Sequence, residues 1–333
     1  MVATPADDAT GPLRELTRTG RFADALAAFR GLPPGVAASR PDAQLLAATA
    51  ATRLGELGVA EELAGSALEQ FHARGDADGR LRSLNLLGVI YFERGRMQDS
   101  ERVLAQALGL ANQVGDSLLA ARANNNLASA LHVRGRPEEA LGLYRGALLA
   151  YQRLGDRRGA AESYHNLGLI FRQLGDWRNA EDATTMALRH AELVGERGLL
   201  ALATTGRAEL MVERAQFDQA GLELERAGRW AEEAGDEIGV AEAQRVGALA
   251  ALRAREYATA FERAEAARAT AHERGTVLLA AECSVIAALA LRRLGRTNEA
   301  AARKAEAENG FRALGAVSLL ERLTRDWSET TTP

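Results

Sequence analysis

The sequence predicts an all-α fold, a single elongated stack of helical hairpins. Three observations support this prediction. Small residues return every 40 positions, each period holds two amphipathic helical patterns, and no stretch alternates in the manner of a β-strand. A chain of 333 residues would ordinarily divide into two or three domains. The unbroken period instead indicates one solenoid, in which each unit contacts mainly its neighbours.

Four series of residues carry the period. One glycine series marks the junctions between units, and a second marks the turn inside each unit, where Ala215 and Arg255 replace two of the glycines. Glycine suits the left-handed position just past a helix end, and alanine lets paired helices approach closely. The series are Gly35, Gly75, Gly115, Gly155, Gly195, Gly235, Gly275 and Gly315; Gly55, Gly95, Gly135, Gly175 and Gly295; Ala60, Ser100, Ala140, Ala180, Ala220, Ala260 and Ala300; and Ala67, Ala107, Ala147, Ala187, Ala227, Ala267 and Ala307.

The elements follow from this period in chain order. We expect a disordered leader at 1–12, a shortened hairpin at 13–34, seven 40-residue units at 35–314, a capping helix at 316–327 and a disordered tail at 328–333. One solenoid of about eight hairpins would thus span 13–327. The capping helix is amphipathic, so its apolar side would cover the exposed end of the stack.

Within a unit, two helices are joined by a very short turn and are therefore antiparallel neighbours. In the third unit they are expected at about 117–134 and 137–154. Aspartate follows the junction glycine in several units, where it is a favoured residue for capping the start of the next helix. These aspartates are Asp76, Asp116, Asp156 and Asp236.

The residues of one unit resemble the tetratricopeptide repeat, in which a Leu-Gly…Tyr pattern marks the first helix and an Ala…bulky…Ala pattern the second. The unit is about six residues longer than the usual ~34. The late proline of the family is replaced by Asn112, Gln152 and Glu192. The matching residues are Leu87, Gly88 and Tyr91 with Ser100, Leu104 and Ala107, and Leu167, Gly168 and Phe171 with Ala180, Thr184 and Ala187.

Longer repeats of this kind are similar to those of kinesin light chain, spindle-orientation adaptors and bacterial peptide-sensing regulators. The resemblance covers about residues 13–314. It implies a right-handed α-α superhelix in which the first helix of each unit lines the concave side. It also implies a protein or peptide partner.

Charge and composition narrow the class of function. The 41 basic and 45 acidic residues give a net charge of −4, whereas nucleic-acid binders usually carry a basic face. A single cysteine excludes a disulfide framework and a cysteine-based zinc site. The chain shows neither a signal-peptide pattern nor an apolar run of membrane-spanning length. We therefore expect a cytoplasmic protein with no nucleic-acid or membrane partner.

Polar side chains occupy the predicted concave side in the middle units. An asparagine amide carries both donors and an acceptor, so it can pair with an extended peptide backbone of any sequence. Arginines beside it can pair with a carboxylate. The alternative is that these are solvated or interhelical polar groups of a wide groove. The predicted peptide-binding residues are Arg82, Asn85, Arg122, Asn125, Asn126, Ser129, Glu162, His165, Asn166 and Arg172.

In the last units the predicted concave side is apolar instead. An exposed apolar patch usually marks a contact site. Its occupant would be the amphipathic helix of a partner, a second copy of the chain in a homodimer through the C-terminal repeats, or the terminal helix of the same molecule. Alternatively, the helix register differs and these residues are core. They are Val246, Leu249, Leu252, Val285, Ile286 and Leu289.

Catalytic and metal chemistry is not indicated. His132 lies seven residues further along its helix than the level of His165, a separation of about 10 Å at ~1.5 Å per residue, which is too long for both to bind one zinc ion with Glu162. Cys283 is more typical of a core residue than of a nucleophile. Phosphate-loop, dinucleotide and metalloprotease motifs are absent. We expect no enzymatic activity, no metal and no cofactor.

The sequence therefore favours a non-enzymatic scaffold that binds an extended peptide or protein segment in the concave groove. The alternative is a regulatory sensor that responds to a signal peptide and controls a separate effector protein. An enzyme built on a solenoid is a third hypothesis, and no motif supports it.

Overall fold

A computed structural model describes residues 10–329, and all the regular secondary structure within that range is helical. Most of the expected leader and the last four residues of the expected tail lie outside the described residues. The helices are α1 (Thr10–Arg18), α2 (Phe22–Arg30), α3 (Pro34–Ser39), α4 (Pro41–Arg53), α5 (Leu57–Ala73), α6 (Ala77–Glu93), α7 (Met97–Val114), α8 (Ser117–Val133), α9 (Pro137–Leu154), α10 (Arg157–Gln173), α11 (Trp177–Val194), α12 (Arg197–Glu213), α13 (Phe217–Glu233), α14 (Glu237–Arg253), α15 (Tyr257–Glu273), α16 (Val277–Arg293), α17 (Thr297–Leu314) and α18 (Val317–Glu329).

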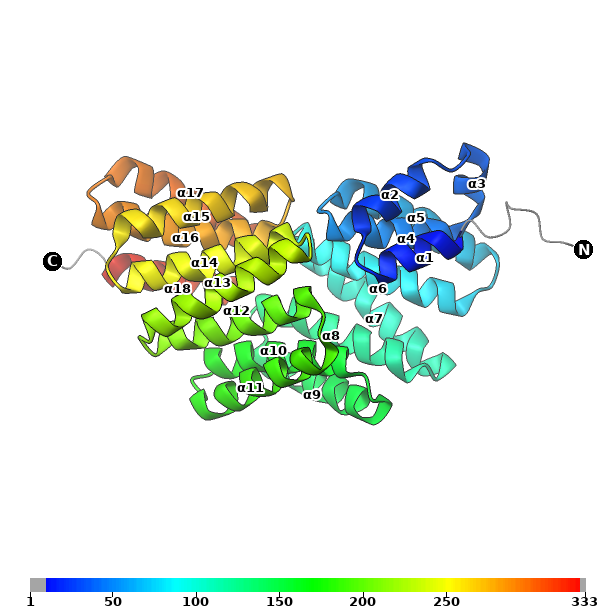
Figure 1. The fold of residues 1–333 in the computed structure, drawn as a ribbon, viewed down its shortest axis with the longest axis horizontal. Coiled ribbons are helices and arrows are strands. Elements are labelled where there is room, and N and C mark those ends of the chain that lie inside the picture. The colour runs from blue at the N-terminus through cyan, green and yellow to red at the C-terminus, as the bar shows by residue number, and fades with distance from the viewer. Residues whose placement is uncertain (1–9, 330–333) are drawn as a thin grey trace, which may run out of the picture.

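The helices form a stack of hairpins, which confirms the predicted fold class. From α4 onward, each even-numbered helix packs against the odd-numbered helix that follows it. The even-numbered helices also pack on one another from unit to unit, so they form the inner wall of the stack. We call α4 to α16 with even numbers the inner helices, and α5 to α17 with odd numbers the outer helices. Figure 1 shows the stack bending around until its two ends approach each other.

The small residues of the repeat lie where paired helices touch, as predicted. The alanines of both alanine series are fully buried. Gly88 on α6 faces Leu104 on α7 so closely that an added Cβ would lie 2.4 Å from the Leu104 Cγ atom. The buried hydroxyl of Ser100 donates a 2.7 Å hydrogen bond to the Gly88 carbonyl across the same contact. A larger residue at either position would overpack the hairpin.

The turns and junctions follow the glycine series with one exception. The junction and turn glycines from Gly55 onward have positive φ, and Ala215 (φ 57°) and Arg255 (φ 67°) take the same conformation. Four junction aspartates accept a hydrogen bond from the backbone N–H three residues later, which confirms the predicted caps. Gly35 is the exception. It lies inside α3, which begins with Pro34 at its first position, so the first full unit begins at Pro41 rather than at residue 35.

Both ends of the solenoid extend beyond the expected bounds. Helix α1 begins at Thr10, so residues 10–12 are helical rather than part of a leader, because Pro12 lies in the first turn, where proline is tolerated. Helix α18 continues to Glu329, two residues past the expected 327. Its buried Leu323 packs with Phe311 of α17, so α18 caps the last hairpin.

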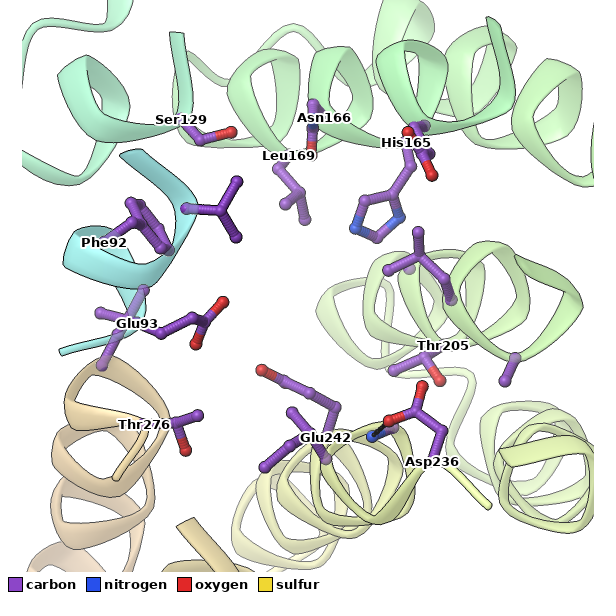
Figure 2. A pocket seen from close by; sticks show the side chains of 18 of the residues that line it. Phe92, Glu93, Ser129, His165, Asn166, Leu169, Thr205, Asp236, Glu242 and Thr276 are labelled. Carbon is purple, nitrogen blue, oxygen red and sulfur yellow. Dashed lines mark hydrogen bonds between the residues drawn. The ribbon is translucent and has the colours of Figure 1, made fainter. Parts of the chain in front are cut away.

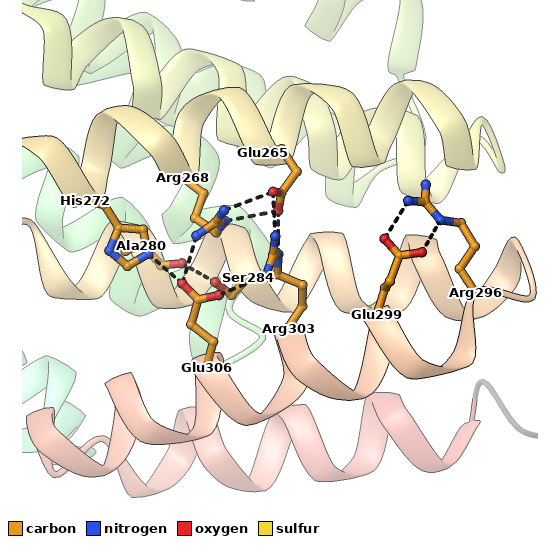
Figure 3. A network of polar contacts seen from close by, with 9 residues as sticks. All are labelled: Glu265, Arg268, His272, Ala280, Ser284, Arg296, Glu299, Arg303 and Glu306. Atoms are coloured by element: carbon orange, nitrogen blue, oxygen red, sulfur yellow. Dashed lines mark hydrogen bonds and ion pairs between the residues drawn. The ribbon is translucent and has the colours of Figure 1, made fainter.

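Ion pairs connect the last outer helices on the convex face (Figure 3). Glu265 of α15 accepts hydrogen bonds from Arg268 and from Arg303 of α17, the latter at 2.8 Å. Arg268 also donates to Glu306 at 3.0 Å. Burial raises the pKa of Glu265, but the hydrogen bonds from Arg303 and Arg268 outweigh it and lower the pKa to about 2. This carboxylate is therefore ionised at neutral pH and joins two outer helices.

Candidate functional site

The inner helices surround a channel of about 2320 Å³. Figure 2 shows side chains from α6, α8, α10, α12 and α14 pointing into it from all sides, together with Thr276 of the junction before α16. The volume is well above the ~300–1,000 Å³ of ordinary small-molecule pockets. All ten residues of the predicted peptide-binding set line this channel.

The asparagines pair with one another between neighbouring inner helices. The Asn126 side chain on α8 donates to Asn85 Oδ1 on α6 at 3.1 Å, and Asn166 on α10 donates to Asn125 Oδ1 at 3.4 Å. A pair of this kind uses one polar atom of each amide, which leaves the second atom of each amide for another partner. The interhelical role that the sequence left as an alternative is therefore real, and it uses only part of the hydrogen-bonding capacity.

Asn125 is the most buried of the four, with 6% of its surface exposed. Its Oδ1 also accepts a 3.1 Å hydrogen bond from the Ser163 hydroxyl of α10. Its main role is therefore to hold α8 against α10. Asn85, Asn126 and Asn166 are each partly exposed to the channel.

The three predicted arginines differ in what they contact. Arg82 pairs with Asp78 at 2.8 Å, and Arg172 pairs with the buried carboxylate of Glu209 at 2.9 Å. Both are thus already neutralised, which the sequence did not predict. Arg122 is exposed and forms no ion pair with any residue that the structure describes. Of the three, it is the one whose charge is open to a carboxylate from outside.

The remaining predicted polar residues are held by neighbours. Ser129 shares a 2.8 Å hydrogen bond with Tyr144 of α9, and Glu162 accepts from Arg158 at 3.2 Å. The His165 ring lies against the α12 backbone, where an added Cβ on Gly206 would be 2.6 Å from its Nδ1. Burial lowers the pKa of His165 to about 4, so the ring is neutral at pH 7.

A network of buried charges lies on the opposite wall. Glu209 of α12 binds Arg172 and also Arg245 of α14, the latter at 3.2 Å, and Arg245 reaches Glu242 at 2.9 Å and Glu282 of α16 at 3.4 Å. Burial raises the pKa of Glu209, but Arg172 and Arg245 outweigh it and hold the pKa far below its usual range. Opposite charges 36 or 37 residues apart at inward positions are the sequence signal for this network.

Glu93 at the end of α6 also faces the channel and was not among the predicted site residues (Figure 2). It forms no ion pair or hydrogen bond with the described residues. Burial, with a further contribution from Glu242, raises its pKa to about 7. Only the ring-like closure of the stack brings these two carboxylates near each other, since they are far apart in the sequence.

The predicted apolar patch is partly wrong. Val246 is fully buried in a core cluster with Val212 and Leu224, because position 246 faces the outer helix α13 rather than the channel. Ile286 and Leu289 reach the channel wall with only 3% and 8% of their surfaces exposed. Leu249, Leu252 and Val285 also line the channel.

The terminal helix of the same molecule covers part of that patch. Val285 packs in one cluster with Leu319 and Leu320 of α18. Two of the alternatives left open by the sequence therefore both apply. Val246 is a core residue, and Val285 is covered by the terminal helix of the same molecule.

Neither a metal-binding cluster nor an exposed thiol occurs in the part of the chain that the structure describes. No three His, Cys, Asp or Glu side chains are grouped so that they could hold a metal ion within residues 10–329. Cys283 is fully buried, and burial raises the pKa of its thiol. Over the same range, every helix is too short or too polar to cross a membrane.

Comparison with solved structures identifies similar folds. A Rap protein complexed with competence and sporulation factor is 15% identical, with 93% of this chain and 99% of that chain covered and a TM-score of 0.69. The Rap conjugation gene regulator of plasmid pLS20, in complex with the Phr* peptide, is 17% identical over 86% and 76% of the two chains, with a TM-score of 0.67. The apo form of RapI is 14% identical over 81% and 97%, with a TM-score of 0.58. At these identities the likeness is one of fold.

Comparison at the level of sequence finds repeats. Family models described as tetratricopeptide repeat match residues 80–114 and 119–193, which carry the asparagine pairs. No curated protein matches the chain. The chain therefore contains tetratricopeptide repeats at residues 80–114 and 119–193, and its stack of hairpins shares the fold of these solved structures.

Proposed function

We propose that this protein is a non-enzymatic scaffold that binds an extended peptide or protein segment in the channel, along α6, α8 and α10. The observation that carries the proposal is the pairing of the asparagines. Each pair is fixed in position by one hydrogen bond and keeps one unused polar atom on each amide. A preorganised group loses little entropy on binding, which favours affinity.

The chemistry of this wall suits a peptide backbone. An extended backbone presents both N–H and C=O groups, and amide side chains can pair with either without demanding a particular sequence. Arg122 adds a cation for an acidic side chain or a C-terminal carboxylate. The volume of the channel also suits a peptide better than a small molecule.

A second candidate is a regulatory sensor that responds to a signal peptide and controls a separate effector. Two of the solved structures with a similar fold are complexes, one with competence and sporulation factor and one with the Phr* peptide. That likeness supports the candidate by fold alone. The cytoplasm remains the expected location. Homodimerisation through the C-terminal repeats remains a prediction, with less apolar surface than the sequence suggested.

The test begins with a peptide selected from a display library on the full chain. The double variant Asn85→Ala/Asn166→Ala is expected to bind it at least tenfold more weakly by calorimetry, because lost backbone hydrogen bonds cost about 0.5–1.5 kcal/mol each. Asn125 is left intact because it is buried. The matched control is Asn112→Ala/Asn298→Ala, two exposed asparagines on outer helices. Equal affinity of the two double variants would refute the proposal.

The sensor candidate is separated by a second measurement on the same samples. Saturating peptide would change the radius of gyration in X-ray scattering if the chain is a sensor. If the peptide binds and the radius of gyration is unchanged, the sensor candidate is rejected and the scaffold candidate is retained.

A further inference from the structure

The channel is closed along one side by contacts between distant parts of the stack. The turns after α4, α6 and α8 meet the junctions before α16 and α18, as the approach of the two ends in Figure 1 shows. We call this contact the seam. We propose that the seam is a gate, which opens without unfolding the hairpins and admits a polypeptide sideways into the channel. The identification of the ligand as a polypeptide rests on the proposed function, whereas the opening of the seam does not depend on it.

Close contacts run along the whole seam. Arg274 donates a 2.9 Å hydrogen bond to the Leu54 carbonyl, 220 residues away. A Cβ added to Gly55 would lie 2.6 Å from the Arg274 Cδ atom, and one added to Gly95 would lie 3.3 Å from both Leu314 and Val277. Glycine at these turns therefore lets the two edges approach to direct contact.

Equivalent positions of the repeat show that the seam, and not the repeat itself, buries these edges. Met97 begins α7 at the seam and is 3% exposed, whereas Trp177 begins α11 at the equivalent position and is 42% exposed. At the junction edge, Leu314 lies under α18 and the seam and is 1% exposed, whereas its equivalents Val114 and Leu154 are both 49% exposed. The seam thus covers apolar residues that face solvent elsewhere in the same stack.

The seam is much thinner than the interfaces along the stack. It is made by turns and helix ends, and no two helices pack side by side across it as neighbouring helices do within the stack. Arg274 also keeps a partner on its own side, since its Nε donates to Glu237 at 2.8 Å. Contacts with little buried area are the ones that open first in a folded protein. Separation of the seam leaves every hairpin interface intact.

A gate of this kind determines which ligands can reach the channel. With the seam closed, only a free chain end can thread the ring. A segment flanked by folded domains on both sides needs the seam to open. The gate therefore distinguishes a short free peptide from an internal segment of a larger protein.

The first test measures the closed state by a cross-link. A Cβ added to Gly135 would lie 3.6 Å from the Ser318 Cβ, within the ~3.5–4.5 Å range of disulfides. The pair Gly135→Cys/Ser318→Cys is expected to form a disulfide with oxidised glutathione as the oxidant, while the buried Cys283 stays reduced. Failure to cross-link in the folded protein would show that the seam is not closed.

A wedge variant then tests whether the seam opens as a unit. Gly55→Leu in the cross-linking background should slow disulfide formation at 135/318 at least tenfold, because its side chain meets Arg274. The matched control is Gly175→Leu, which has almost the same φ (73° against 72°) and meets no atom of the described residues within 4 Å. Both variants are expected to keep the same helicity and to melt together. An equal cross-linking rate, or unfolding of the wedge variant alone, would overturn the gate.

The second test concerns access. The display-selected peptide is placed between two folded fluorescent proteins, and its association rate with the cross-linked and the reduced pair is compared. Cross-linking is expected to slow this flanked peptide at least tenfold and to leave the free peptide unaffected. If the cross-link slows neither peptide, the gate is overturned while the proposed function stands. If the free peptide binds outside the channel, the proposed function is refuted, but the evidence for the gate from the wedge variant is unaffected.

Discussion

The two walls of the channel use their polar side chains in different ways. On α6, α8 and α10, neutral amides pair once and keep unused donor and acceptor atoms. On α12, α14 and α16, charged groups neutralise one another around Glu209 and Arg245. The same inward positions of one repeat thus serve two purposes. We propose that the first wall binds a peptide and that the second maintains the shape of the ring.

The comparison also extends to the turns. In the first half, the turns at Gly95, Gly135 and Gly175 have glycine at the left-handed position. In the second half, Ala215 and Arg255 adopt it with a side chain attached, at a cost of about 1–2 kcal/mol each. A strained turn persists only where the surrounding packing determines it. The packing of the second half therefore holds these two turns in a conformation that is locally strained.

The largest expected effect is in the charged wall. Arg245→Met should lower the free energy of unfolding by about 3–5 kcal/mol, because Glu209, Glu242 and Glu282 would be left without their shared cation. Urea denaturation measures it. The control is Arg253→Met, whose half-exposed ion pair with Glu213 is worth about 0–1 kcal/mol. If Arg245→Met lowers the free energy of unfolding by less than ~1 kcal/mol, the structural role that we assign to this wall is wrong.

The next effect is a pH dependence at the meeting point of the two walls. The pKa of Glu93 is raised from 4.5 to about 7, so the folded protein keeps this proton after the unfolded chain has released it. The stability from Glu93 is therefore complete below pH ~4.5 and is lost as pH rises through ~7. Wild type should lose about 1–3 kcal/mol relative to Glu93→Gln between pH 4.5 and 8. Parallel stability curves for the two proteins would contradict the assignment.

An effect of similar size is expected in the amide wall. Asn125→Ala should cost about 1–3 kcal/mol, because the Ser163 hydroxyl and the Asn166 amide lose a buried acceptor. Asn85→Ala should cost less than ~1 kcal/mol, since its pair is partly exposed. Thermal denaturation of the two variants measures the difference. A reversed order would mean that Asn85 and not Asn125 holds this wall together.

The smallest effect is a gain. Arg255→Gly should raise the free energy of unfolding by about 0.5–1 kcal/mol, because glycine adopts positive φ without strain. Gly175→Ala, at the equivalent turn of the first half, should lose a similar amount. Chemical denaturation measures both changes in the free energy of unfolding. Changes of opposite sign would support the contrast between the two halves, and changes of equal sign would contradict it.

Much of the fold could be predicted because its determinants are local and periodic. A glycine that ends a helix and an alanine that admits its neighbour act within one or two turns, so a 40-residue period determines the hairpins and the inner wall. The ten polar site residues follow from the same period, and all of them line the channel. Their roles in binding remain a prediction.

The features that were missed depend on long-range geometry. The seam and the proximity of Glu93 to Glu242 arise because a small rotation per unit accumulates around the ring, and no single unit encodes the sum. Val246 was misplaced for a different reason. Its repeat equivalents Asn126 and Asn166 line the channel, whereas the valine side chain packs in the core cluster with Val212 and Leu224, a difference that the period of the repeat does not reveal.

The most direct test of the account is the spectrum of the asparagine side chains. With only asparagine labelled by ¹⁵N, the side-chain NH₂ signals of the chain divide into those of the channel wall (Asn85, Asn125, Asn126 and Asn166) and those elsewhere (Asn112, Asn124, Asn179, Asn298 and Asn309). On addition of the display-selected peptide, the first group is expected to shift and the second to stay in place. Binding with the first group unmoved would contradict the claim that the amide wall holds the peptide.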